Sequence, residues 1–260
     1  MKKWMIRALS ALLIAAFLPV SVLADEYDLN EGSVTVSTSK RQDGSTKQEV
    51  NHKNTTKEDS NPIITSKGQQ TGNSITINAE KNTTANVTIK DTNISASGAA
   101  IKTEGQGDVN LNIEGTNSAS SGRSFAGVEK HNDGELTIGS ESGEGKLTAN
   151  GGRYAAGIGG GAASGGSNIT ISGGNVTANG GKYAAGIGGG TASGGSNITI
   201  SGGKVTANGG DYAAGIGGGG GGSGSGSNIT ISGGEVTATG GTNGAGIGGG
   251  SRGSGSDITI

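Results

Sequence analysis

The 260-residue chain contains no cysteine, only two prolines, and seven aromatic side chains (one Trp, four Tyr and two Phe). Without cysteine it can form neither a disulfide scaffold nor a thiolate metal site. Collagen requires abundant proline and a glycine at every third position, and the sequence has neither. Enzymes of this length usually bury more large side chains than this chain owns. Several familiar protein classes are therefore excluded by composition alone.

Charge is also scarce, particularly in the second half of the chain. The formal net charge is −2, and residues 151–260 carry four positive and three negative side chains. They are Arg153, Lys182, Lys204, Asp211, Glu235, Arg252 and Asp257. Such sparse charge makes no basic patch for nucleic acid, so we expect no nucleic-acid partner. Glycine is abundant instead, because 42 of the 56 glycines lie in residues 151–260.

Residues 1–24 are typical of a secretory signal peptide. A basic start, Met1–Arg7, precedes an apolar run from Ala8 to Leu18, and small residues occupy the −3 and −1 positions before Asp25. The run is too short to span the roughly 30 Å hydrocarbon core of a bilayer as a helix. We predict that the protein is secreted or extracellular, with association with the cell wall as one form of this location. We predict no membrane span once the signal peptide is cleaved. The alternative is an uncleaved N-terminal anchor.

A long repeat fills the rest of the chain. The unit Asn168–Gly190 recurs from Asn197 and from Asn228, and a further copy opens at Asp257. More degenerate copies extend back to about residue 73. Self-similarity at a fixed period indicates units that stack on one another and share one continuous core. We predict about six such coils in residues 73–260.

Each unit contains three short segments in which apolar residues alternate with polar or very small ones. In one unit these are Ile169–Ile171, Val176–Ala178 and Ala185–Ile187, separated by Gly, Ser and Asn. Alternation with a period of two indicates strands with one buried face. The pattern predicts an all-β fold, a parallel β-helix with three short strands per coil. A disordered glycine-rich linker is the rival interpretation, but a linker has no reason to keep Ile and Val in phase.

Stacking the units predicts specific neighbours. The four interior ladders are Ile169 with Ile198, Ile229 and Ile258; Ile171 with Ile200, Ile231 and Ile260; Val176 with Val205 and Val236; and Ile158 with Ile187, Ile216 and Ile247. On the outer face, Lys182 is predicted beside Asp211, and Lys204 beside Glu235.

The two ends of the repeat region differ from its middle. Residues 25–72 are polar, and we predict that they cap the first coil, whose sheet edge would otherwise be open. The sequence ends within a predicted strand at Ile260, which suggests a fragment or a truncated gene product.

The repeat Ile-Thr-Ile-Ser-Gly-Gly-x-Val-Thr-Ala-x-Gly-Gly, followed by Ala-Gly-Ile-Gly-Gly-Gly, resembles that of glycine-rich β-helix surface proteins of Clostridia-type Gram-positive bacteria. Many of these are called carbohydrate-binding-domain-containing proteins. The resemblance covers about residues 73–260. It implies a right-handed β-helix that binds, without cleaving, acidic plant polysaccharide such as polygalacturonate or another cell-surface glycan, with calcium at its surface. The resemblance assigns no binding residue to a position of this chain.

Three tyrosines are candidate carbohydrate-binding residues. Tyr154, Tyr183 and Tyr212 recur at one position of successive units, and Asn243 follows them. If they point outward they form an aromatic strip for sugar rings, and if they point inward they cap the core at a corner. Alternation counted back from Ile187 favours the inward orientation.

Four carboxylates are candidate metal ligands. Asp91, Asp108, Glu114 and Asp133 lie in the degenerate coils and could supply oxygen atoms to Ca²⁺. The alternative, which we favour, is a set of solvated charges on an outer face.

A second calcium motif is only partly present. Gly253–Asp257 is similar to part of a calcium-binding nonapeptide, but the equivalent positions in the other units are Asn168, Asn197 and Asn228. A turn or ladder of Asn side chains is the favoured interpretation.

Catalysis has little support. His52 and His131 are the only histidines, and neither has an evident nucleophile beside it. The sequence therefore predicts a non-enzymatic, secreted or cell-surface, carbohydrate-binding β-helix. The alternative is a structural stalk or adhesin segment of a larger surface protein. A polysaccharide lyase that uses the clustered carboxylates is the least favoured hypothesis.

Overall fold

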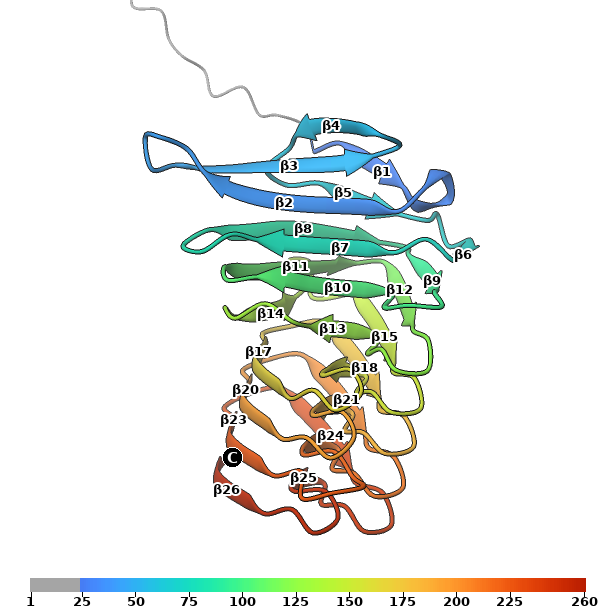
Figure 1. The fold of residues 1–260 in the computed structure, drawn as a ribbon, viewed down its shortest axis with the longest axis vertical. Coiled ribbons are helices and arrows are strands. Elements are labelled where there is room, and N and C mark those ends of the chain that lie inside the picture. The colour runs from blue at the N-terminus through green and yellow to red at the C-terminus, as the bar shows by residue number, and fades with distance from the viewer. Residues whose placement is uncertain (1–23) are drawn as a thin grey trace, which may run out of the picture.

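The computed structural model describes residues 24–260, and the expected signal peptide lies outside these residues except for Ala24. Among the described residues the fold is a stack of short β-strands, and the helical part is one 3-10 turn, η1 (Leu29–Glu31) (Figure 1). The strands form three sheets that run along the stack. The predicted parallel β-helix is confirmed.

The first sheet has nine strands and the third has seven. In spatial order the first sheet contains β1 (Glu26–Asp28), β5 (Ile63–Thr65), β8 (Thr84–Lys90), β11 (Asp108–Glu114), β14 (Leu136–Gly139), β17 (Gly166–Ile171), β20 (Gly195–Ile200), β23 (Gly226–Ile231) and β26 (Gly255–Thr259). The third contains β6 (Gln70–Thr71), β9 (Asn93–Ser95), β12 (Thr116–Ser120), β15 (Lys146–Asn150), β18 (Asn175–Asn179), β21 (Lys204–Asn208) and β24 (Glu235–Thr239).

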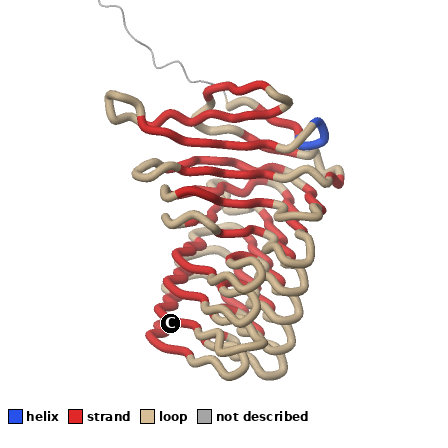
Figure 2. The backbone as a smooth tube through the Cα atoms, in the orientation of Figure 1, coloured by secondary structure: helices blue, strands red, loops and turns tan. Residues whose placement is uncertain are grey.

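The second sheet has ten strands. They are β4 (Thr55–Glu58), β3 (Thr46–His52), β2 (Val34–Lys40), β7 (Ile75–Ala79), β10 (Ile101–Gly105), β13 (Val128–Lys130), β16 (Ile158–Gly159), β19 (Ile187–Gly188), β22 (Ile216–Gly217) and β25 (Ile247–Gly248). From β7 onward the chain passes from the second sheet to the first, then to the third, and back to the second. In the second sheet the strands shorten toward the C-terminal end, from seven residues in β2 to two residues in β16, β19, β22 and β25 (Figure 2).

The core consists of apolar ladders that run along the inside of the stack. Ile169 pairs in register with Ile198, which pairs with Ile229, and Ile229 pairs with Ile258. The valine ladder and the two other isoleucine ladders form as predicted, except that Ile260 lies beyond β26 and is 83% exposed. Burying each such side chain contributes about 1.5–3 kcal/mol. The outward threonines between them remain partly accessible to water.

One predicted strand has the wrong bounds. The segment Ala185–Ile187 is not a strand, because the chain turns through residues 182–184 and pairing begins only at Ile187. Glycine in this segment allows the backbones of successive coils to pack closely. Gly188 has a φ of 129°, and a Cβ on it would lie 2.2 Å from the carbonyl oxygen of Gly217 in the next coil. Only glycine combines that backbone conformation with such an approach.

Residues 25–72 contribute the first turn and an added hairpin. The strands β1, β5 and β6 continue the first and third sheets, and β2 pairs in parallel with β7. The hairpin strands β3 and β4 then add to the end of the second sheet in antiparallel orientation. The edge strand β4 is exposed and carries Lys57 and Glu58, and charged residues at an edge discourage further pairing.

Asparagine side chains form a hydrogen-bonded ladder on the outside of the first sheet. Asn197 Nδ2 donates to Asn168 Oδ1 (2.9 Å), and Asn228 Nδ2 donates to Asn197 Oδ1 (2.7 Å). All three residues have φ between 50° and 55°, a conformation that asparagine tolerates better than most residues. Asp257 takes the same conformation at the next position. The asparagine ladder inferred from the sequence is confirmed.

The two predicted outer ion pairs are also confirmed. Lys182 lies 3.6 Å from Asp211, and Lys204 lies 2.7 Å from Glu235. Both pairs are exposed, so each contributes only about 0.2–1 kcal/mol. In the described part of the chain, no helix has the length and apolar character needed to cross a membrane.

Replacing Asn197 by aspartate should weaken the ladder in a pH-dependent way. A carboxylate cannot donate to Asn168 Oδ1, so we expect a loss of about 1 kcal/mol in the free energy of unfolding at pH 7. The neutral acid can donate to Asn168 Oδ1 and the carboxylate cannot, so the deficit should shrink as the pH falls toward 3. Urea unfolding at several pH values measures this, with Asn54→Asp as control, because Asn54 lies in an exposed turn and has a similar positive φ. A deficit independent of pH would contradict the ladder.

Gly188→Ala should destabilise the stack by about 3 kcal/mol or more, because the new Cβ overlaps the Gly217 carbonyl and the φ is unfavourable. The matched control is Gly98→Ala, whose Cβ would meet no atom within 4 Å. Its effect should stay within about 0.5 kcal/mol. Thermal unfolding of the two variants checks the prediction, and equal losses would refute the close packing of these coils.

Candidate functional site

The three repeated tyrosines stack on one another outside the core. Tyr154 and Tyr183 have ring centroids 5.9 Å apart with planes 9° from parallel, and Tyr183 and Tyr212 are 5.9 Å apart at 6°. Tyr212 is 38% exposed, and none of the three belongs to the buried core. The inward orientation favoured by alternation is wrong. Each tyrosine lies in the turn between the third and second sheets, where the strand periodicity does not apply.

Cationic side chains accompany the rings. The guanidinium carbon of Arg123 lies 5.1 Å from the centroid of Tyr154, and that of Arg153 lies 5.6 Å from Tyr154 and 6.0 Å from Tyr183. Lys182 Nζ lies 5.6 Å from the centroid of Tyr183. At these distances a cation is attracted to the ring face. Arg123 also donates to the Tyr154 hydroxyl (3.0 Å), and this hydrogen bond lowers the pKa of that hydroxyl.

We call this set the tyrosine–cation strip; it comprises Arg123, Arg153, Tyr154, Lys182, Tyr183 and Tyr212. A hollow of about 270 Å³ adjoins it, lined by Tyr183, Tyr212, Gly221, Gly222, Ser251 and Arg252. This part of the chain is two residues longer than the neighbouring unit, because the repeat from Asn197 to Asn228 spans 31 residues instead of 29.

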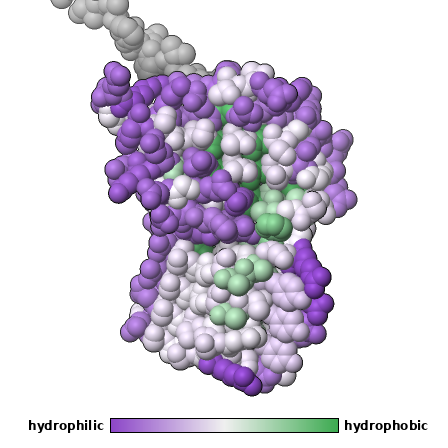
Figure 3. Space-filling view, in the orientation of Figure 1, coloured by the Kyte–Doolittle hydropathy of each residue, from purple (hydrophilic) through white to green (hydrophobic). Residues whose placement is uncertain are grey.

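The strip carries positive charge that other side chains leave unneutralised. Of its cations, Lys182 pairs with Asp211, whereas Arg123 and Arg153 take part in none of the ion pairs found in residues 24–260. Arg252, beside the hollow, also pairs with no carboxylate in this part of the structure. The face shown in Figure 3 is mostly strongly hydrophilic over the N-terminal coils and paler over the glycine-rich coils. Because the ring faces contact one another, the strip offers ring edges, hydroxyls and cations to a ligand.

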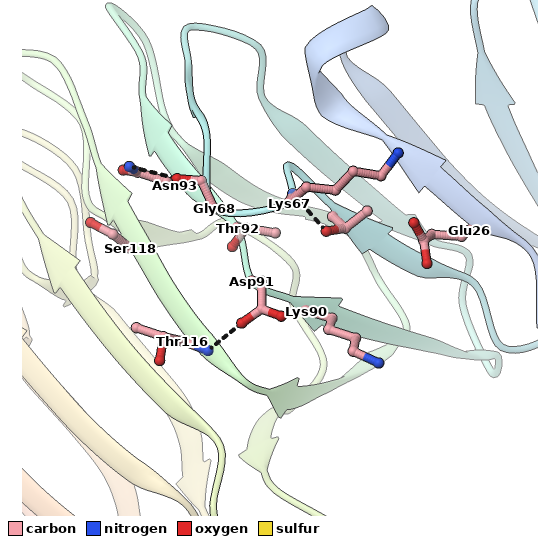
Figure 4. Close-up of a pocket in the computed structure, with 10 residues that line it drawn as sticks. Glu26, Lys67, Gly68, Lys90, Asp91, Thr92, Asn93, Thr116 and Ser118 are labelled. Atoms are coloured by element: carbon pink, nitrogen blue, oxygen red, sulfur yellow. Dashed lines mark hydrogen bonds between the residues drawn. The ribbon is translucent and has the colours of Figure 1, made fainter.

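A larger hollow, of about 570 Å³, lies at the corner between the first and third sheets in the early coils (Figure 4). It is lined by Glu26, Thr65, Lys67, Gly68, Lys90, Asp91, Thr92, Asn93, Thr116 and Ser118. The third-sheet strands β6 and β9 are shorter than β12, which leaves the corner recessed.

The lysines of the corner hollow are partnered. Lys67 lies 2.9 Å from Asp28, and this contact lowers the pKa of the Asp28 carboxyl, whereas Lys90 lies 4.0 Å from Glu114. The corner hollow is therefore polar and close to electrically balanced, unlike the strip.

The four candidate metal ligands do not converge. Asp91 and Glu114 lie at the corner after β8 and β11, whereas Asp108 begins β11 and Asp133 precedes β14. The length of β11 separates Asp108 from Glu114 by about 20 Å. Within residues 24–260 there is no group of three or more His, Asp or Glu side chains that could hold a metal ion. The set proposed from sequence therefore does not form one site.

Two of these carboxylates have structural roles instead. Asp91 Oδ1 accepts a hydrogen bond from the backbone N–H of Thr116 (2.9 Å). Asp108 Oδ1 accepts one from the N–H of Glu135 (2.8 Å). Each carboxylate thus fixes the start of the strand that follows it in the next coil.

A buried charged group in β13 is not evident from the repeat. Lys130 occupies an interior position, in register with Thr103, and is 6% exposed. Its ammonium donates to the carbonyl oxygen of Asn132. Burial lowers the pKa of Lys130 to about 8, although Asp133 and other nearby carboxylates oppose this shift. The alternation from Val128 could have placed this side chain inside.

The residue before Lys130 in β13, Glu129, is also buried and has its own polar contacts. Glu129 is buried, with Oε2 accepting from the Ala126 N–H (2.9 Å) and Oε1 lying 3.2 Å from His131 Nε2. Lys130 points into the coil and Glu129 is covered, so neither presents a charged group to a surface ligand.

Comparison with known proteins supports the fold and does not extend to a ligand. A protein-family model described as "Beta helix repeat" matches residues 142–167, 169–191, 198–221 and 229–251. No curated protein and no solved structure matches the chain. The family match in residues 142–251 and the three-sheet solenoid together support a β-helix repeat fold.

Lys130→Met should remove the cost of burying a charged ammonium in the folded state, and this cost depends on pH. The lysine pKa is lower in the folded state than in the unfolded state, so the unfolded chain binds the proton more tightly between pH 8 and 10.5. Between pH 8 and 10.5 the free energy of unfolding of the wild type should therefore rise relative to that of the variant, by on the order of 2 kcal/mol. Urea unfolding at pH 7 to 10.5 tests this. The control Lys146→Met removes an exposed amine on β15. A constant difference between wild type and Lys130→Met would refute the assignment.

Proposed function

We propose that this β-helix repeat protein is a non-catalytic, carbohydrate-binding protein that holds an acidic polysaccharide along the tyrosine–cation strip. The observation that carries the proposal is the placement of Arg123 and Arg153 against a continuous tyrosine stack without a carboxylate partner. Arg252 adds a third such guanidinium beside the adjoining hollow.

The chemistry of the strip suits carboxylated sugars. A guanidinium group can bind a carboxylate through two parallel hydrogen bonds, which adds geometric specificity to charge attraction. The stacked rings hold the arginine side chains at the surface of successive coils. A polymer with one carboxylate per sugar would then meet Arg123, Arg153 and Lys182 in three successive coils, before Asp211 takes the same position in the next. The resemblance to carbohydrate-binding surface proteins supports the same ligand class.

The protein acts outside the cell, and calcium is a second means of holding the polysaccharide. The signal-peptide-like residues 1–24 support secretion or a cell-wall location. Carboxylates of a polysaccharide can be met directly by the arginines, and calcium could add to this by bridging carboxylates of the ligand and the protein. The two routes differ in their response to a chelator.

A structural stalk or adhesin segment is the second candidate function. The observation that favours it is the unbroken parallel pairing of the first sheet from β5 to β26, which joins successive coils along the whole solenoid. A stalk requires this continuity and needs no glycan affinity.

Affinity electrophoresis on pectin, xylan and peptidoglycan, with calcium and with a chelator, separates these functions. We expect retardation on pectin, less on neutral xylan, and no change in polysaccharide chain length. The absence of retardation on every polymer would favour the stalk. Unsaturated products that absorb in the ultraviolet would contradict a non-catalytic role.

Arg153→Ala should weaken binding to pectin about threefold to tenfold, because it removes the cation that lies against both Tyr154 and Tyr183. The matched control is Lys204→Ala, which removes the same charge from the third sheet, where Lys204 pairs with Glu235. Dissociation constants from affinity electrophoresis measure the effect. Equal losses in both variants would show that net charge, and not the strip, determines binding.

A further inference from the structure

We propose that Asn243 is a site of spontaneous deamidation, and that its conversion to aspartate or isoaspartate weakens ligand binding at the neighbouring strip. The modification follows from the fold alone, whereas its effect on binding rests on the proposed function. The two parts are therefore tested separately.

Four Asn-Gly pairs occur in the chain, at Asn150, Asn179, Asn208 and Asn243. In such a pair the glycine backbone nitrogen, after losing its proton to hydroxide, can attack the asparagine Cγ. A bond forms between that nitrogen and Cγ, the Cγ–Nδ2 bond breaks, and Nδ2 takes a proton from water and leaves as ammonia, which regenerates the hydroxide. Water then opens the resulting succinimide to aspartate or isoaspartate. Glycine favours this attack because it has no side chain to crowd the nitrogen.

The fold restrains the electrophile in three of the four pairs. Asn179 Nδ2 donates to Asn150 Oδ1 (2.8 Å), and Asn208 Nδ2 donates to Asn179 Oδ1 (2.8 Å). Asn150 Nδ2 in turn donates to Ser120 Oγ (2.9 Å). None of these three amide groups can rotate toward the following glycine without breaking a ladder that joins several coils.

The fold also restrains the nucleophile in the same three pairs. The N–H of Gly151 donates to the carbonyl of Asn179 (2.9 Å), and that of Gly180 donates to the carbonyl of Asn208 (2.8 Å). The N–H of Gly209 donates to the carbonyl of Thr239 (2.8 Å). These hydrogen bonds connect one coil to the next, so reaction requires that stacked coils separate locally.

Asn243 lacks both restraints. It is exposed in a turn, and its side chain makes no hydrogen bond to any residue of the range 24–260. The N–H of Gly244 donates only to the carbonyl of Gly241 (3.0 Å), within the same turn. Freeing this nitrogen for attack therefore breaks one hydrogen bond inside the turn and none between coils. The geometry therefore selects one of four chemically similar pairs.

The position of Asn243 connects the modification to the strip. Its backbone N–H donates to the carbonyl of Asp211 (3.4 Å), as the N–H of Tyr183 donates to the carbonyl of Arg153 (3.3 Å). Asn243 thus occupies the next position of the tyrosine ladder, after Tyr212. Deamidation adds a negative charge there, close to Asp211, which opposes an acidic polysaccharide.

Peptide mapping by mass spectrometry tests the modification. The folded protein and a sample in concentrated urea are incubated in mildly alkaline buffer, and the four Asn-Gly peptides are compared over time. In urea the four pairs should react at similar rates, because their local sequences are nearly alike. In the folded protein Asn243 should react at least about tenfold faster than the other three. Asn243→Gln, whose longer side chain forms no such five-membered ring, should abolish the folded-state modification.

Two results would overturn the assignment. One is modification of Asn150, Asn179 or Asn208 in the folded protein at the rate of Asn243. The other is an unreacted Asn243 when the urea sample has already reacted.

The effect on binding is measured with Asn243→Asp and a control of equal charge, Asn175→Asp, on the outer face of β18. On pectin at low salt, Asn243→Asp should bind about twofold to fivefold more weakly than the control, and the difference should vanish at high salt. Equal binding would overturn the effect on the strip and leave the modification standing. If the wild-type protein itself shows no pectin binding, the proposed function and this effect both fail, and peptide mapping still decides the modification.

Discussion

Parallel backbone pairing between coils is the constraint on which the rest of this structure depends. It holds equivalent residues of successive coils about 4.8 Å apart along each sheet. The paired registers, such as Val176 with Val205 and Val205 with Val236, continue without a shift through the last three full repeats. Every repeated side chain must therefore tolerate a copy of itself, or a chosen partner, directly above and below. This requirement explains both the interior and the outer surface.

The outer ladders follow from what each side chain can do with its own copy. An asparagine amide both donates and accepts, so a column of asparagines such as Asn168, Asn197 and Asn228 satisfies itself. Tyrosine rings stack with offset faces, and cations lie beside the stack within reach of two rings, as Arg153 does. Like charges repel at this spacing, so the charged columns alternate with neutral or opposite residues, as in Lys204 beside Glu235. The positive strip is an exception to this alternation because the tyrosines separate its arginines.

Much of the fold could be predicted from sequence because a period of two within each strand and a period of about 30 residues between coils leave few alternatives. The isoleucine and valine ladders and the two outer ion pairs came from those periods. The predicted bounds of the third strand were wrong because glycine has no side chain that could show alternation. The sequence pattern therefore did not indicate the turn through residues 182–184. The inward orientation of Tyr183 failed for the same reason. The four carboxylates proposed as metal ligands do not converge, because residues near in sequence lie at opposite ends of β11. The corner hollow was not predicted, because it results from the short strands β6 and β9, whose lengths the repeat does not show.

The central claim is that an acidic polysaccharide lies along the tyrosine–cation strip. The most direct test is to map backbone amide NMR shifts while titrating an acidic oligosaccharide into the protein. We expect shifts concentrated in the strip turns of successive coils, around Arg123, Arg153, Tyr183 and Tyr212, together with Arg252. Shifts confined to the corner hollow around Lys67 and Asp91, or no shifts at saturating ligand, would contradict it.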